Sequence, residues 1–331
     1  LNVYYLKNDE RIPFSVRVLW HLIDLWSPWS RAAIRHVIKN ESPDVIITHN
    51  LKGIGVGIAL EIQQRGVPHI HTLHDVQLSV PSGLLIAGEE ASFLNRSFLR
   101  RWYEAAVKRQ IGIPDLVLSP SKFLVDFYRE RGMFTDVRVE VLANPLPPEN
   151  RPELPKTRPQ MKTKFLFVGQ LEPHKGVSLL LASLDQLGED VELHFAGEGS
   201  LAECVSDRAQ RDIRVTYHGF VSLNNLVKLL EHIDAVVLPS ICYENSPTVI
   251  YEAFLIGVPV IASRIGGIPE LVEDGVSGLL VAPGNTEELV AAMHRIHNER
   301  DVWWKRKTAI RENAQQYSLE TYVTRLETFM R

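Results

Sequence analysis

The chain contains 331 residues, which exceeds the usual size of one domain, so we expect two domains of about 150 residues each. Hydrophobic residues make up 45% of it and charged residues 23%, a composition that is typical of a globular enzyme and excludes a disordered or fibrous protein. The net charge of -4 offers no positive excess for a nucleic-acid partner, and two cysteines, Cys204 and Cys242, are too few for a disulfide framework and too isolated for a zinc site.

The chain begins with leucine rather than methionine, and its first residues, LNVYYL, have the pattern of a strand. We therefore expect the natural N-terminal segment to be missing. No apolar run reaches the roughly 18 residues that would cross a bilayer, and no signal-peptide pattern is present. Together with the low cysteine content, this predicts a protein of the cytoplasm.

In the first half, short apolar runs alternate with amphipathic stretches, a pattern that predicts strand-helix-strand units and a parallel sheet. The expected strands are residues 44–48, 69–74 and 115–119, with a fourth around 137–142. Residues 145–159 then contain six prolines and no apolar periodicity, which indicates a linker. We place the domain boundary there, with a first domain over residues 1–150 and a second from residue 151.

The segment GIGVGIAL, residues 53–60, follows the first of these strands and mimics a dinucleotide-binding fingerprint. Leu60 occupies the position of the third glycine, so we interpret the segment as close helix packing instead of a nicotinamide site. No G-x-S-x-G elbow and no P-loop lysine motif occurs in the sequence, and hydrolase and nucleotide triphosphatase functions therefore lack support.

Residues 92–111 mix large apolar side chains with basic ones. They include Phe93, Leu94, Phe98, Leu99, Trp102 and Tyr103 beside Arg96, Arg100, Arg101, Lys108 and Arg109. Two interpretations stay open: a basic amphipathic helix that lies on an anionic membrane surface, or an ordinary packed helix with a solvated basic face. A lipid-linked substrate would favour the first interpretation.

The second half repeats the alternation more clearly. The expected strands are residues 165–169, 191–196, 213–218, 235–239, 258–262 and 278–281. A spacing near 3.6 predicts a helix with one buried stripe, formed by Val177, Leu180, Leu181, Leu184 and Leu187. These elements predict a doubly wound α/β domain, whose ligand lies beyond the carboxyl ends of the strands, near the loops after Gly169, Pro239 and Ala262.

The most informative stretch is PSICYENSPTVIYEAFLIGVPVIAS, in which Glu244 and Glu252 stand eight residues apart. We expect Ser246 to be an N-cap and Pro247 the first helical residue, with Glu244 in the preceding loop and Glu252 in the helix. The first amides of that helix would favour a diphosphate. Two carboxylates beside a diphosphate would repel it, so we expect them to accept hydrogen bonds from sugar and ribose hydroxyls.

This stretch resembles the E-x7-E hallmark of the family 4 glycosyltransferases, also described as group 1, which have the GT-B fold. The resemblance continues through VGQLEPHKG, FAGEGS, HGFV and GGIPELVEDGVSGLLVAPGN, and so covers almost the whole second half. It implies two Rossmann-like domains that face each other across a cleft, a nucleotide-sugar domain over residues 151–311, and a C-terminal helix within residues 312–331 that packs back on the first domain. Relatives also carry a glycine-rich loop after their first strand, which this chain lacks, consistent with the expected truncation.

The resemblance implies roles for individual residues. Glu244 would contact the donor sugar and Glu252 the ribose. Lys175 matches a basic residue on the donor phosphates, whereas Gln170 stands where relatives have arginine and leaves one fewer positive charge. The implied donor-binding residues are Gly169, Gln170, Lys175, Gly197, Glu198, Gly219, Val221, Glu244, Asn245, Ser246, Pro247, Thr248, Val249 and Glu252.

His74, in the segment HTLHDV, matches the active-site histidine of the family and completes a catalytic set with Lys175 and Glu244. His71 and His74 are both residue types that bind metals, but three residues apart on a strand they would face opposite sides, so we expect no metal site. No cofactor is implied beyond the nucleotide sugar, which is a co-substrate.

These observations predict a retaining, metal-independent enzyme. It would move a hexosyl group from a UDP- or GDP-linked sugar to a glycan, lipid-linked or small-molecule acceptor, as in bacterial polysaccharide or glycolipid biosynthesis. Its expected location is the cytoplasm, with the inner face of the membrane as a candidate surface. The alternative is a sugar-nucleotide binding or processing protein of the same architecture, phosphorylase-like or epimerase-like, although no segment singles out the lysine that a pyridoxal phosphate phosphorylase needs.

Overall fold

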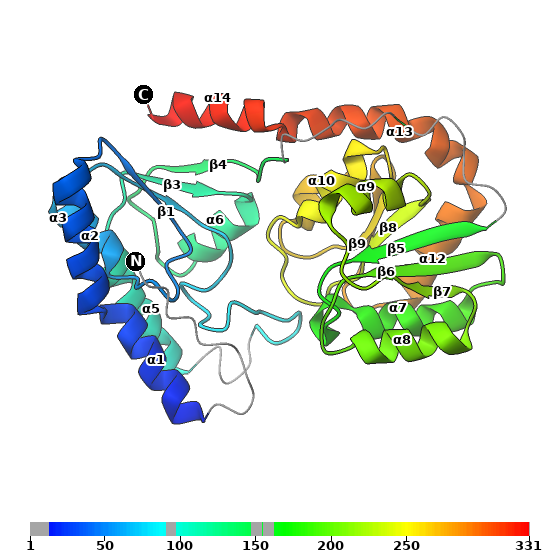
Figure 1. The fold of residues 1–331 in the computed structure, drawn as a ribbon, viewed down its shortest axis with the longest axis horizontal. Helices are drawn as coiled ribbons and strands as arrows, with labels where there is room; N and C mark the ends of the chain where they lie inside the picture. The colour runs from blue at the N-terminus through cyan, green and yellow to red at the C-terminus, as the bar shows by residue number, and fades with distance from the viewer. Residues whose placement is uncertain (1–12, 91–96, 147–153, 155–161, 331) are drawn as a thin grey trace. The chain divides into compact units, whose positions relative to one another are not determined.

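Figure 1 shows a computed structural model of the chain, which describes residues 13–90, 97–146, 154 and 162–330. The chain folds into two compact units, Leu1–Leu142 and Ala143–Arg331, and each contains its own parallel sheet. The predicted linker at residues 145–159 lies mostly outside the described residues, and the strand expected at residues 1–6 lies wholly outside them.

The first unit contains a four-stranded sheet of order β1-β2-β3-β4, with every neighbouring pair parallel. The strands are β1 (Ile46–His49), β2 (His69–Thr72), β3 (Leu116–Ser119) and β4 (Val139–Val141). All four predicted strands are therefore present, each shorter than or shifted slightly from its predicted range.

Five helices of the described part of the first unit are α1 (Phe14–Trp26), α2 (Pro28–Glu41), α3 (Ile58–Gln64), α5 (Phe98–Ile111) and α6 (Lys122–Arg129). Ile34 of α2 packs against Ile58 and Ile62 of α3 in one buried cluster. The segment at residues 53–60 thus leads into a helix that packs closely on its neighbour, which confirms its interpretation as a packing element.

The second unit contains a six-stranded parallel sheet of order β10-β9-β8-β5-β6-β7. Its strands are β5 (Thr163–Val168), β6 (Val191–Ala196), β7 (Val215–Tyr217), β8 (Ala235–Leu238), β9 (Val260–Ser263) and β10 (Gly278–Val281). All six predicted strands are present. They read as nearly continuous apolar runs because helices cover both faces of the sheet, so that side chains of either parity are buried.

The 3-10 and α-helices of the second unit are η1 (Pro173–Lys175), α7 (Val177–Ser183), η2 (Leu184–Gln186), α8 (Ala202–Arg211), α9 (Leu223–Leu230), α10 (Thr248–Leu255), α11 (Ile268–Leu271), α12 (Thr286–Asn298), α13 (Arg300–Ala314), η3 (Gln315–Tyr317) and α14 (Leu319–Met330). Helices α7 and α8 lie on one face of the sheet, and α9 and α10 lie on the other (Figure 1). This confirms the doubly wound architecture. The predicted helical stripe is buried in α7 and η2, where Val177, Leu180 and Leu184 are fully covered.

The C-terminal helix α14 has the bounds that its apolar residues indicate, and it belongs to a unit that begins at Ala143. The packing of this helix on the first domain stays a prediction.

Candidate functional site

The strand order of the second unit reverses beside β5, which pairs with β6 on one side and with β8 on the other. From β5 the chain moves outward through β6 and β7, and it later returns to β8 and moves outward the other way through β9 and β10. Ligands of doubly wound sheets bind at such a switch point, beyond the carboxyl ends of the strands. The loops that follow β5, β6, β8 and β9 therefore frame the candidate site.

Backbone hydrogen bonds join the loops that follow β5, β6 and β7, and the pairs are Gly169 N to Ala196 O (3.0 Å), Leu171 N to Glu198 O (2.8 Å) and Gly197 N to Gly219 O (2.8 Å). The predicted residues of the first, second and third loops are thus brought together by main-chain contacts. The side chains of Gln170 and Glu198 are exposed and make no hydrogen bond to any other residue that the structure describes, while Val221 is half-buried two residues beyond Gly219.

Lys175 lies at the end of the turn η1, directly before a glycine that no other residue could replace without strain. Gly176 has a φ of +77°, and a Cβ atom there would lie 2.0 Å from the carbonyl oxygen of Pro239. The amide of Ile241 also donates to the carbonyl of His174 at 2.9 Å. The K-G pair is therefore held against the loop that follows β8, which carries Glu244.

Lys175 and Glu244 form an ion pair, with 2.6 Å between Nζ and Oε1. Both side chains are largely covered, at 23% and 15% exposed. The buried hydroxyl of Ser240 donates to the same Oε1 at 2.9 Å. Two predicted catalytic residues that stand 69 positions apart in the sequence are thus in direct contact.

The backbone of Glu244 is held by the loop after β9. The amide of Gly267 donates to the carbonyl oxygen of Glu244 at 2.8 Å. Gly266 has a φ of +60°, and a Cβ atom on it would lie 2.0 Å from that same oxygen. The GGIPELV motif therefore acts as a support for Glu244, and Gly266 is needed for close approach.

Cys242 is buried in the same loop. Burial, followed by the charge of Glu244, raises the pKa of its thiol to about 11. The thiol therefore stays protonated at neutral pH, and Cys242 is no candidate for a thiolate nucleophile.

The start of α10 differs from the prediction. Pro247 occupies the N-cap position with an extended backbone, φ −66° and ψ 119°, so the first helical residue is Thr248. The hydroxyl of Ser246 pairs with the hydroxyl of Tyr251 instead of capping the helix. The predicted N-cap role of Ser246 is therefore wrong, but the first helical amides still belong to Thr248 and Val249, and such amides lack partners within the helix.

Glu252 lies one turn further along α10, with Thr248 on the same face. Burial raises the pKa of Glu252, and a hydrogen bond from the Thr248 side chain acts in the opposite direction. Asn245 is half-buried between Glu244 and Ser246 in the preceding loop. The predicted segment thus presents a charged carboxylate, a set of helix amides and a second, more buried carboxyl group in sequence.

His74 lies in the first unit, beside a depression that we call the first-unit hollow. Residues that line this hollow include Asp24, Lys52, His71, His74, Asp75 and Tyr103. His74 Nε2 lies 2.9 Å from Nδ1 of His49, and burial lowers the pKa of both rings. His74 is thus in a polar concave site, at the carboxyl end of its sheet as predicted.

The expected orientation of His71 and His74 is wrong. β2 ends at Thr72, so His74 is in the following loop and the alternation of a strand does not extend to it. Both histidines line the same hollow. Among the residues that the structure describes, no group of three or more His, Cys, Asp and Glu side chains is arranged to hold a metal ion.

Three further residues of the hollow and its rim, Asp24, His49 and Lys52, were not predicted from the sequence. Burial raises the pKa of Asp24 to about 6, although the Gly53 amide donates to its carboxylate at 2.8 Å. Burial lowers the pKa of Lys52. These residues come from different elements, and the one available signal was that His49 directly follows the strand predicted at residues 44–48. In the structure His49 ends β1, opposite Thr72 of the strand that leads to His74.

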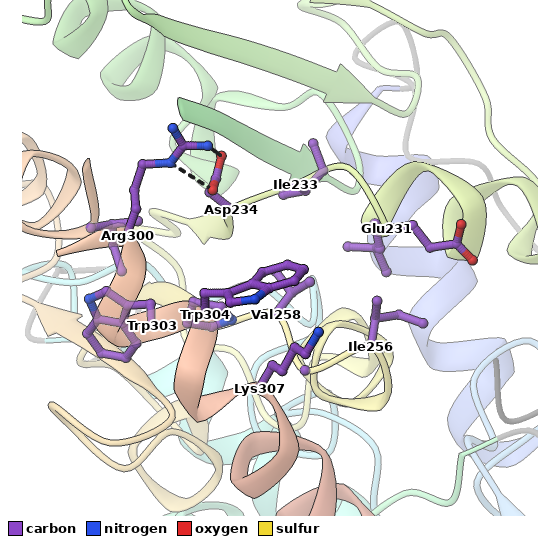
Figure 2. Close-up of a pocket in the computed structure, with 13 residues that line it drawn as sticks. Glu231, Ile233, Asp234, Ile256, Val258, Arg300, Trp303, Trp304 and Lys307 are labelled. Carbon is purple, nitrogen blue, oxygen red and sulfur yellow. Dashed lines mark hydrogen bonds and ion pairs between the residues drawn. The ribbon is translucent and has the colours of Figure 1, made fainter. Parts of the chain in front are cut away.

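A second pocket lies at the amino ends of the strands in the second unit, near the start of β8 and β9 (Figure 2). The Arg300 guanidinium pairs there with Asp234, with 3.0 Å between Nε and Oδ1, and Lys307 Nζ lies 3.7 Å from the centre of the Trp304 ring. None of the predicted site residues lines this pocket. Its position at the amino ends of the strands favours a structural role for the ion pair.

Comparison with protein families identifies both halves of the chain. Residues 150–317 match the model described as glycosyl transferases group 1, and residues 4–150 match the model described as glycosyltransferase family 4.

Individual relatives are similar over different shares of the chain. An uncharacterized glycosyltransferase of Methanocaldococcus jannaschii is 32% identical over 48% of this chain, and a glycogen synthase of Mycobacterium tuberculosis is 29% identical over 82% of it. The chain spans 40% and 64% of the length of these two relatives. Among solved structures, Anabaena HepE in complex with UDP matches 90% of this chain and 81% of its own, with a TM-score of 0.69 and 22% identity, a similarity of fold.

Proposed function

Because the chain belongs to the glycosyl transferases group 1 family, and its two parallel-sheet units have the GT-B fold, we propose that it transfers a hexosyl group from a nucleotide diphosphate sugar to a carbohydrate or lipid-linked acceptor, with retention of configuration. The observation that carries the proposal is the contact of Lys175 with Glu244 beside the first turn of α10. A cation, helix amides and a carboxylate at one switch point suit a ligand that is both anionic and polyhydroxylated.

In the proposed donor complex, the diphosphate lies at the amides of Thr248 and Val249, with Lys175 as its counter-charge. Glu244 accepts hydrogen bonds from hydroxyls of the sugar, and Glu252 accepts them from the ribose. Gln170 contributes no charge, so Lys175 and the helix amides supply the stabilisation of the leaving group. We propose that this suffices without a metal ion.

In the reaction, the bond between the anomeric carbon and the diphosphate oxygen breaks, and the acceptor hydroxyl oxygen bonds to the anomeric carbon from the same face. The acceptor proton passes to a phosphate oxygen of the leaving group. Negative charge grows on the diphosphate in the transition state, where the fixed Lys175 and helix dipole favour it. His74 would serve on the sugar side of this reaction, as the family resemblance implies.

A nucleotide screen followed by product analysis tests this function. UDP, GDP and ADP are compared by thermal shift, because a ligand that binds only the folded state stabilises it by about 2.7 kcal/mol at one hundred times its Kd. We test UDP first, since HepE has been solved with UDP. A panel of sugar nucleotides then follows, with anomeric configuration read by NMR. Formation of a sugar 1-phosphate or an epimerised sugar nucleotide would instead support the processing alternative, and absence of any nucleotide binding would contradict both.

We further propose that α1 and α5 bring the enzyme to an anionic membrane surface. Their exposed side chains include Leu19, Phe98 and Leu99, at 58%, 79% and 68% exposed, and the rings of Trp26 and Trp102 lie 5.8 Å apart. Exposed basic residues on α5 are Arg101, Lys108 and Arg109. Large apolar and basic side chains together suit binding at a lipid interface. Among the described residues, no helix is long and apolar enough to cross a bilayer.

Sedimentation with vesicles tests the membrane proposal. The chain should sediment with phosphatidylserine vesicles at low salt and lose binding at high salt. The double variant Phe98→Ser and Leu99→Ser should reduce binding at least tenfold, since each buried apolar side chain contributes about 1.5–3 kcal/mol. Ile213→Ser, which removes a similarly exposed side chain from the second unit, is the matched control. Equal sedimentation with neutral vesicles would contradict the proposal.

A further inference from the structure

Behind the first-unit hollow, a continuous chain of side-chain hydrogen bonds connects α3 to β2. Gln63 Nε2 lies 3.0 Å from His69 Nδ1, His69 Nε2 lies 2.8 Å from Thr48 Oγ1, and Thr48 Oγ1 lies 2.8 Å from His71 Nδ1. All of these members except Gln63 are buried. This series of hydrogen bonds ends at His71, which lines the hollow.

The backbone fixes the orientation of Gln63 at the start of this chain. Its Nε2 group donates to the carbonyl oxygen of Ile111 at 2.8 Å, and its Oε1 accepts from the amide of Ile113 at 2.9 Å. A carbonyl can only accept and a backbone amide can only donate, so the side-chain amide cannot be reversed. The second proton of Nε2 is therefore available to His69 Nδ1.

The remaining proton positions follow from this direction. A neutral imidazole that accepts at Nδ1 carries its proton at Nε2, so His69 donates to Thr48 Oγ1. The single hydroxyl proton of Thr48 then goes to His71 Nδ1 at 2.8 Å in preference to the carbonyl of Ile70, which is 3.5 Å away. His71 accepts at Nδ1 and consequently carries its proton at Nε2.

His71 is 2% exposed, and its Nε2 makes no hydrogen bond to any of the residues that the structure describes. Burial, followed by the neighbouring histidines His69, His49 and His74, lowers its pKa to about 3, so the ring is neutral at physiological pH. An N–H group on the wall of a hollow, with no hydrogen-bond partner among the described residues, can donate to an acceptor that enters the hollow. The hollow is the route by which such an acceptor can arrive.

We propose that His71 binds a carbohydrate oxygen in the first-unit hollow by donating a hydrogen bond from Nε2–H. Gln63, His69 and Thr48 are positioning residues that keep the proton of His71 at Nε2. The choice of a carbohydrate rests on the proposed function. The hollow also presents Lys52 as a donor and the carboxyl groups of Asp24 and Asp75, a mixture of donors and acceptors that suits hydroxyl groups, each of which can donate and accept.

The direct test is nitrogen NMR of the full chain labelled with 15N-histidine. The wild type and Thr48→Ser should show His71 protonated at Nε2. Thr48→Val removes the hydroxyl at nearly the same volume and should give a mixture of both tautomers. Gln63→Glu places an acceptor opposite His69 Nδ1. This should reverse the donor-acceptor direction of each hydrogen bond from residue 63 to His71 and move the His71 proton to Nδ1. A wild-type proton on Nδ1, or a Gln63→Glu spectrum with an unchanged His71 signal, would overturn the proposal.

Kinetics give the functional readout, with transfer from UDP-glucose to a panel of sugars as the first probe. Thr48→Val should raise KM about tenfold at unchanged kcat, the effect of one lost hydrogen bond that is made equally in the ground and transition states. Thr48→Ser, which keeps the hydroxyl, should recover most of the loss, and Thr135→Val, which removes an exposed hydroxyl of the same unit, is the control. An unchanged KM in Thr48→Val would contradict the proposal.

UDP binding separates this inference from the proposed function. A thermal shift with UDP reports on the site of the second unit, and Thr48→Val should not alter it. A chain that binds no nucleotide would contradict the proposed function, whereas the NMR spectra would still decide the polarity of His71.

Discussion

The site in the second unit and the hollow in the first unit hold their polar groups by different means. In the second unit, Lys175 and Glu244 are charged partners on loops that are tied to each other through the backbone. In the first unit, burial keeps His71 neutral and raises the pKa of Asp24 to about 6, and side-chain hydrogen bonds set the orientation.

The difference shows why the site of the second unit is more visible in the sequence than the first-unit hollow. A site that depends on close backbone approach needs glycine at particular positions, such as Gly176 and Gly266, and therefore leaves motifs. In the first-unit hollow only His74 lies in a recognisable motif, and hydrogen-bonded residues on separate elements, such as Gln63 and Thr48, leave none. Charge is available to bind a diphosphate in the second unit, and hydrogen bonding is available to recognise hydroxyls in the first.

The largest effect should follow from a change in the backbone contact of the second unit. Gly176→Ala places a Cβ atom 2.0 Å from the carbonyl oxygen of Pro239, so the loops must separate. We expect the free energy of unfolding to fall by about 2 kcal/mol or more beyond the conformational strain, and nucleotide binding to be lost. Gly275→Ala is the control, because Gly275 has the same φ of +77° with no atom within 4 Å, and it should lose only about 1–2 kcal/mol. Urea unfolding of both variants measures this, and equal losses would show that the contact is unimportant.

The second largest effect should follow from removal of the positive charge of Lys175. Lys175→Ala should lower kcat/KM about 100-fold or more, the scale of losing one preorganised electrostatic group, while the folded state is retained. Lys305→Ala, on the exposed surface of α13, is the control. Steady-state kinetics together with thermal unfolding check the prediction, and a rate near that of the wild type would reject the role of Lys175.

The neutral histidines of the first unit predict a dependence on pH. Burial lowers the pKa of His71 to about 3, whereas in the unfolded chain the ring protonates below its usual value of 6.5. Protons then favour the unfolded state, so the free energy of unfolding falls as the pH drops below 6.5. From pH 7 to pH 5 this contribution reaches about 2 kcal/mol. Asp24, with its raised pKa, acts in the opposite direction over part of the same range.

The variant His71→Gln isolates that contribution. Its urea-unfolding free energy should depend less on pH than that of the wild type by about 2 kcal/mol between pH 7 and pH 5. The comparison cancels the effect of Asp24 and of the other histidines, because both proteins contain them. Parallel pH curves would show that His71 is not held neutral by burial.

The smallest effect should come from the hydroxyl that supports Glu244. Ser240→Ala removes a 2.9 Å hydrogen bond to Oε1 but leaves the ion pair with Lys175 in place. We expect kcat/KM to fall about fivefold, which corresponds to about 1 kcal/mol, the typical net contribution of one hydrogen bond. Ser178→Ala, at an exposed position of α7, should match the wild type in the same assay. A loss as large as that of Lys175→Ala would place Ser240 in contact with the substrate.

The strands were the most predictable part of the fold. β6 and β10 have the bounds that were expected, because continuous apolar runs in a sheet covered on both faces begin and end with the strand. Helix starts were less predictable. Ser246 and Pro247 have the composition of a cap and a first turn, but Tyr251 offers the serine a tertiary hydrogen bond that no local pattern reveals.

The site could be predicted where residue type and loop position coincide. Glu244 was predicted in the loop before a helix, Lys175 was assigned through the family resemblance of its K-G pair, and the structure brings the two into contact. Ser240 and His49 could not be assigned in this way, because a serine or histidine at a strand end has many ordinary partners. Only the pairing of elements distant in the sequence shows which partner is present.

The backbone bond between Gly267 and Glu244 separates the frame of the site from its chemistry. The loop is anchored through an amide and a carbonyl that every residue type except proline possesses, so the side chain at position 244 can be exchanged while the anchoring bond remains. A new preference for a sugar can therefore arise by replacing single side chains on an intact framework. A change of sugar preference at this end of the sheet does not require a change in the backbone of the loops.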